Sequence, residues 1–62
     1  MRKINIIKGR FLGSNVMSNT VFTLKNLTED KGKVIAVVDA SDLLGKEYSS
    51  LSINVEDYKI LD

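Results

Sequence analysis

The sequence predicts a small all-β domain, a five-stranded antiparallel barrel or strongly bent sheet with one short helical turn near residues 40–45. Runs rich in Ile, Val, Phe and Thr, which favour strands, are separated by turn segments that contain Gly, Asn or Asp. Several runs alternate apolar and polar residues, as a strand with one buried face does. The chain has 62 residues without Cys or His, which predicts one domain over 1–62 held together without disulfides or common zinc sites.

The first predicted strand covers residues 3–12. Ile4 and Ile6 lie on one face, and the apolar positions then change face toward Phe11. Gly9 lies between the two sets and indicates a bulge or a sharp bend, because glycine inside a strand often marks one.

The second predicted strand covers residues 16–27 and follows a turn at residues 13–15. Phe22 and Leu24 share one face, which Asn26 continues. A hairpin of the first two strands through this turn is one arrangement that the sequence allows.

The third predicted strand, residues 33–38, is apolar on both faces. Such a strand is either central in the fold or has one face covered by a partner. Ile35 and Val37 point to one side, and the sequence leaves open whether the opposite face is core or interface. The candidates for a protein interface on that opposite face are Val34, Ala36 and Val38.

The fourth predicted strand, residues 50–55, alternates apolar and polar residues with a period of two. Its apolar side lies at odd positions up to Val55 and at even positions from Tyr58 onward. A single 3₁₀ turn after Val55, followed by a short fifth strand over residues 58–61, explains this change.

Residues 39–45 predict the helical turn. Asp39 or Ser41 can accept hydrogen bonds from the amides at its start, and Gly45 can end it with a positive φ. Asp39 and Asp42 also form a carboxylate pair suited to a hard cation, but their spacing matches no calcium loop. We therefore expect capping rather than metal binding.

Five short strands, a tight hairpin with a charged tip and a 3₁₀ turn before a short closing strand form a layout that resembles Src-homology-3-like small barrels. The resemblance covers most of the chain and carries no diagnostic motif. The Pro and aromatic residues that line the groove of peptide-binding members are missing, so it implies no proline-rich ligand. The alternatives are an oligonucleotide-binding-type barrel, which needs more residues, and a different small sheet with one packed helical turn.

The composition argues against an enzyme. Without His and Cys, the chain lacks the usual general base near neutral pH and the usual thiol nucleophile. It contains neither a Gly-x-Ser-x-Gly nucleophile motif nor a Gly-x-x-x-x-Gly-Lys-Ser/Thr phosphate loop. A chain this short also has little volume for a pocket beside its core. We expect no catalytic residue and no cofactor.

Charge is divided unevenly along the chain. Residues 1–28 hold five cations and no acid, for +5, whereas residues 29–62 hold all eight acids and four lysines, for −4. Lys8 and Arg10 are two residues apart and share a face of the first strand, and Lys25 joins them if the first two strands pair as a hairpin. A basic face of this kind suits a nucleic acid or nucleotide, although the pI near 8.0 is low for that class. The candidates for an anionic ligand are Lys8, Arg10 and Lys25.

We expect a non-enzymatic binding module that acts through protein–protein contact, with nucleic-acid or nucleotide binding through the basic face as the alternative. The small size favours a homo-oligomer, because a short chain buries little surface. Tyr48 joins the interface candidates because tyrosine is enriched in interfaces. One form of this hypothesis is a phage-encoded accessory protein that modulates a host protein. The lack of Cys and of a long apolar segment favours the cytoplasm and no membrane span.

Overall fold

The computed structural model describes residues 2–11, 14–15 and 19–61. Most of them lie in strands, and one short helical region interrupts the strands near the middle of the chain. Within these residues, no helix is both long enough and apolar enough to span a membrane. The elements in chain order are β1 (Lys3–Phe11), β2 (Ser14–Asn15), β3 (Thr20–Asp30), β4 (Lys33–Asp39), α1 (Ser41–Leu44), the 3₁₀ helix η1 (Lys46–Tyr48) and β5 (Leu51–Leu61).

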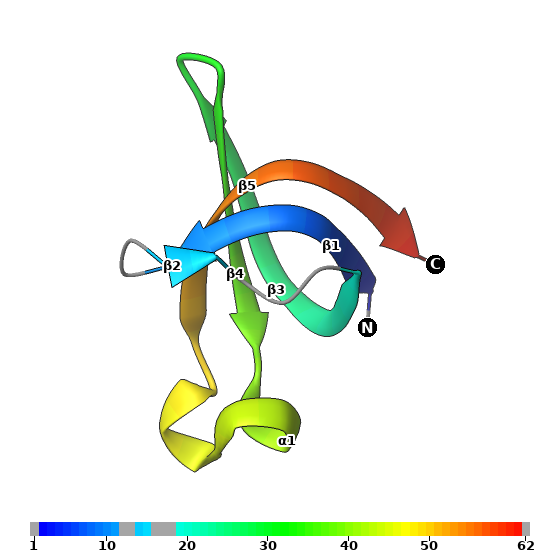
Figure 1. The fold of residues 1–62 in the computed structure, drawn as a ribbon, viewed down its shortest axis with the longest axis vertical. Coiled ribbons are helices and arrows are strands. Elements are labelled where there is room, and N and C mark those ends of the chain that lie inside the picture. Colours follow the sequence, from blue (N-terminus) through cyan, green and yellow to red (C-terminus); the bar gives the residue numbers. More distant parts are fainter. Residues whose placement is uncertain (1, 12–13, 16–18, 62) are drawn as a thin grey trace.

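Four long antiparallel strands form a ring. β1 pairs with both β3 and β5, and β4 pairs with β3 on one side and β5 on the other. Figure 1 shows β1 and β5 arching side by side across the other strands. The two-residue β2 pairs with the end of β1. The structure confirms an all-β fold with one short helical turn, built on four long strands rather than five.

The last strand is continuous, which corrects the expectation of a 3₁₀ turn after Val55 and a separate fifth strand. β5 changes its inward side from Val55 to Tyr58 without ending. Its register with β1 shifts twice, between Ile6 and Lys8 and between Lys8 and Gly9. The irregularity expected near Gly9 is therefore present. At this irregularity successive inward-facing residues are three positions apart instead of two, from Ile6 to Gly9 in β1 and from Val55 to Tyr58 in β5. Because both strands shift in the same way, they stay paired in the ring.

A third irregularity lies in β3. Its register with β4 shifts between Leu24 and Asn26. Leu24 lies opposite Val38, and after the shift Leu27 lies opposite the buried Ala36. Asn26 therefore points away from the core, and the expectation that it continues the face of Leu24 is wrong.

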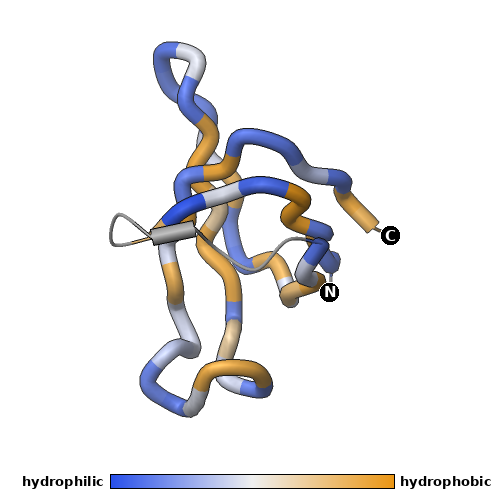
Figure 2. Tube along the Cα trace, viewed as in Figure 1, coloured by the Kyte–Doolittle hydropathy of each residue, from blue (hydrophilic) through white to orange (hydrophobic). Residues whose placement is uncertain are grey.

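The core is small and wholly apolar within the described residues. Phe22 is its one buried aromatic residue, and two of its members are alanines. Figure 2 shows hydrophobic stretches on β4 and a hydrophilic β3–β4 hairpin tip. Burial therefore concentrates where the four strands face one another. The buried hydrophobic residues are Ile4, Ile6, Phe22, Ala36, Val38, Ala40, Ile53 and Val55.

The helical turn forms where the sequence predicts it. The Asp39 Oδ1 atom accepts from the Ser41 backbone amide at 3.0 Å and from the Ser41 hydroxyl at 2.6 Å. Gly45 follows α1 with a φ of 118°, in the region that favours glycine. Asp39 therefore accepts from an amide at the start of α1, as expected, although Ala40 is the N-cap residue and no side chain caps the helix from that position.

Candidate binding surface

β4 presents its two apolar faces to different environments. Ala36 and Val38 are fully buried, and the half-buried Val34 packs against the core. The sequence leaves open whether the face with Val34, Ala36 and Val38 is core or interface. In the structure this face points into the ring of strands. The opposite residues, Ile35 and Val37, lie on the outside of the sheet, and 37% of Ile35 is exposed.

Strand pairing surrounds these two residues with uncharged polar side chains. Ile35 lies between Thr28 of β3 and Asn54 of β5. The flanking side chains are exposed, and none of them carries a charge. We call this group the outer sheet face, and it consists of Asn26, Thr28, Ile35, Val37, Ser52 and Asn54.

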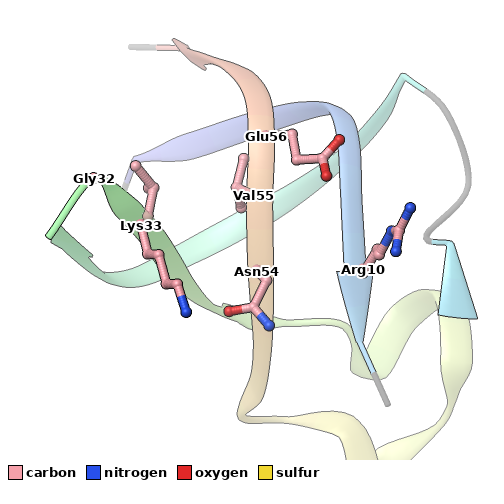
Figure 3. A pocket seen from close by; sticks show the side chains of 7 residues that line it. Arg10, Gly32, Lys33, Asn54, Val55 and Glu56 are labelled. Atoms are coloured by element: carbon pink, nitrogen blue, oxygen red, sulfur yellow. The ribbon is translucent and has the colours of Figure 1, made fainter. Parts of the chain in front are cut away.

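A cleft of about 530 Å³ adjoins one end of the outer sheet face. Arg10 of β1 and Lys33 of β4 lie on opposite sides of Asn54 of β5, as Figure 3 shows. Gly32, Val34, Val55 and Glu56 complete the lining. The rim therefore carries charges of both signs.

The predicted cations do not form one basic face. Lys8 forms an ion pair with Glu56, with 3.2 Å between the Lys8 Nζ and Glu56 Oε2 atoms. Lys8 also lies opposite Asp57 in the register of β1 and β5. Pairing of the first and last strands thus brings the basic and acidic halves of the chain together.

Lys25 lies apart from Lys8 and Arg10. β3 pairs with β1 only over residues 20–23, and the loop after β1 leads into β2 instead of directly into β3. The Lys25 ammonium donates to the Ser50 hydroxyl at 2.8 Å and to the Ser49 carbonyl at 3.2 Å. The condition for Lys25 to join Lys8 and Arg10, a hairpin that places Lys25 beside Arg10, is therefore not met.

Tyr48 is half-buried and packs against the core from η1. Its backbone carbonyl accepts from the Ala40 amide at 2.9 Å, and its amide donates to the Gly45 carbonyl at 3.0 Å. The residue thus closes the helical region against the ring. Because Tyr48 is half-buried, only part of its aromatic side chain is available to a partner.

Hydrogen bonding from Ser41 lowers the pKa of the Asp39 carboxyl. The Ser41 hydroxyl contributes most and the Ser41 amide next, whereas partial desolvation opposes them and attraction to Lys25 adds a smaller lowering effect. No group of three or more Asp or Glu side chains comes together within the part of the chain that the structure describes. The contacts observed for the Asp39 carboxylate are the two hydrogen bonds from Ser41.

Sequence reasoning missed the outer sheet face because both sides of β4 are apolar. The available signal was the polar alternation in β5, where Ser52 and Asn54 mark the outward side. Pairing this strand with β4 assigns Val37 and Ile35 to the same side. No family model, curated protein or solved structure matches the chain.

Proposed function

We propose that this protein is a non-enzymatic binding module that acts through protein–protein contact on its outer sheet face. The observation that carries the proposal is the position of Ile35, which is exposed between the uncharged polar side chains of Thr28 and Asn54. Protein interfaces commonly combine an apolar centre, few central charges and a polar rim. The charged cleft beside Asn54 supplies a rim that can orient a partner.

Photo-crosslinking tests this proposal directly. A photoreactive residue at position 54 should capture a specific protein partner from cells, and the same residue at the exposed position 46 should not. Ile35→Asp should abolish the capture. Leu43→Asp is the matched control, because Leu43 is 53% exposed and lies on α1, away from this sheet face. Equal capture from both positions, or capture that survives Ile35→Asp, would contradict the proposal.

A nucleic acid or nucleotide is the second candidate ligand. The observation in its favour is the placement of Arg10 and Lys33 on one cleft beside the amide of Asn54. Lys8 is paired with Glu56 and Lys25 lies elsewhere, so the expected three-cation face does not support it. Fluorescence anisotropy with a labelled single-stranded oligonucleotide tests this alternative, since phosphate contacts give binding that weakens steeply with salt.

Three finer predictions accompany the proposal. They are a Src-homology-3-like layout, a cytoplasmic location, and a phage-encoded accessory role in which the chain modulates a host protein. The outer sheet face would supply the contact surface for such a role.

A further inference from the structure

Among the residues that the structure describes, no strand lies beside one edge of β3 over its second half. β1 covers β3 only at residues 20–23, and the last backbone link on this side runs from the Leu24 amide to the Arg2 carbonyl at 3.0 Å. Residues 26–30 then pair with β4 alone within the described chain, and Lys25 lies at the register shift without a partner position in β4. All six residues are exposed. An uncovered edge of this kind is a template for another strand.

We propose that a second copy of this chain covers this edge, with the two β3 strands antiparallel about a two-fold axis at Leu27. This inference rests on the proposed protein-contact function and assigns one of its partners. It uses the free edge of β3, which shares Asn26 and Thr28 with the outer sheet face but does not include Ile35.

The segment 25–29 is complementary to itself in that register. Leu27 meets Leu27 of the second copy and Asn26 lies opposite Thr28. The next pair is Lys25 with Glu29, and to form it the Lys25 ammonium must leave the Ser50 hydroxyl and the Ser49 carbonyl. Each polar pair occurs twice because a two-fold interface is reciprocal. Opposite charges on neighbouring strands are favourable, and like charges are unfavourable. A lysine stem is long enough to reach a carboxylate on the adjoining strand.

Apolar surface lies beside the edge. Leu24, Leu27 and Ile60 contribute to a cleft of about 350 Å³, together with Arg2, Lys25 and Asn26. Leu27 is 36% exposed at its border. A second Leu27 at the two-fold axis would remove this apolar surface from water, which favours association.

The exposed area of the chain also favours a partner. The accessible surface is 4488 Å² for 6.9 kDa, whereas scaling for compact monomers gives about 4000 Å² at that mass. The excess of roughly 500 Å² approaches the ~800 Å² that each partner buries in a standard interface. The two joined hairpins would form one sheet with both outer faces on the same side, so a dimer would present two copies of the proposed contact surface.

Sedimentation velocity across a range of protein concentrations tests the inference. The wild-type chain should dimerise, and Leu27→Asp should give a monomer. Lys25→Glu and Glu29→Lys should each raise the dissociation constant by about tenfold or more, because two like-charge contacts replace two attractive ones. The double variant Lys25→Glu/Glu29→Lys should restore dimerisation, which a merely unfolded variant could not do.

Ile35→Asp separates this inference from the proposed function. It should leave the dimer intact while removing partner capture at the outer sheet face. A wild-type chain that stays monomeric at millimolar concentration would overturn the inference, and would mean that the bulge and charges of β3 block its edge. A dimer that persists in Leu27→Asp, or a charge-exchanged double variant that stays monomeric, would also overturn it.

Discussion

Gly9 of β1 lies so close to Ile53 of β5 that a β-carbon at residue 9 would be 3.0 Å from the Ile53 Cγ2 atom. The same carbon would be 3.1 Å from the Asn54 carbonyl oxygen and 3.1 Å from the Ile6 Cγ2 atom. Backbone and buried side chains thus enclose the position on several sides. This close approach lies beside the double register shift that keeps β1 and β5 paired.

Gly9→Ala should therefore lower the free energy of unfolding by about 1–3 kcal/mol, the usual cost of forcing an extra carbon into a packed site. Urea denaturation measures the change. Gly32→Asn is the control, because no atom lies within 4 Å of a β-carbon there and Asn tolerates the left-handed φ of 78°. We expect the control to cost about 1 kcal/mol or less, which is the strain that the positive φ places on a residue with a β-carbon. Equal losses would show that close packing does not set the requirement at Gly9.

The amide side chain of Asn5 gives a second stability prediction. Its Oδ1 atom is buried without a hydrogen-bond partner, on a half-buried β1 residue between Val21 and Lys59 in the strand register. Asn5→Val should raise the free energy of unfolding by about 1 kcal/mol, because it removes an unpaired acceptor and introduces a residue suited to strands. Chemical denaturation would test this.

The exposed Asn54→Val variant is the comparison for Asn5→Val and should change stability by less than about 0.5 kcal/mol. A loss of stability in Asn5→Val would show that solvent satisfies the Asn5 amide.

Local patterns predicted where strands lie, but the long-range pairing required the structure. The shift from Val55 to Tyr58 is visible in the sequence, and a turn explains it as readily as a bulge does. What decides between them is β1, whose own shift from Ile6 to Gly9 matches that of β5. When the inward side switches within one strand, the sequence of that strand alone does not tell a bulge from a turn, and the neighbouring strand is needed to decide.

The candidate surface was hard to predict for a related reason. A strand that is apolar on both faces, such as residues 33–38, gives no periodic signal for which side is buried. Lys25 illustrates the same limit, because its separation from Arg10 depends on which strand follows β1 in the sheet. Charge counted along the chain therefore predicted a basic face, whereas β1–β5 pairing placed Lys8 beside Glu56.

The Lys8–Glu56 ion pair should contribute little to stability. The side chains are 67% and 48% exposed, and water screens pairs of this kind. Glu56→Gln should change the free energy of unfolding by less than about 1 kcal/mol, and by less still in high salt. Thermal or urea unfolding at two salt concentrations measures this change. A loss of stability larger than about 1 kcal/mol would contradict the prediction that the ion pair contributes little. Glu47→Gln, in η1, serves as the control for removing one surface acid.

Asp39 makes stability depend on pH in the acid range. Because Ser41 lowers the pKa of the folded-state carboxyl, the folded state binds a proton less readily than the unfolded chain. The stabilisation that ionised Asp39 contributes is therefore complete above the unfolded-state pKa, which is ~3.9 for an ordinary Asp. It is lost as the pH falls through the lowered folded-state pKa.

Ser41→Ala removes the hydroxyl donor and should move the Asp39 pKa upward, toward its ordinary value. Carboxyl-detected NMR titration measures this shift. An unchanged Asp39 pKa in Ser41→Ala would show that the Ser41 backbone amide alone stabilises the carboxylate.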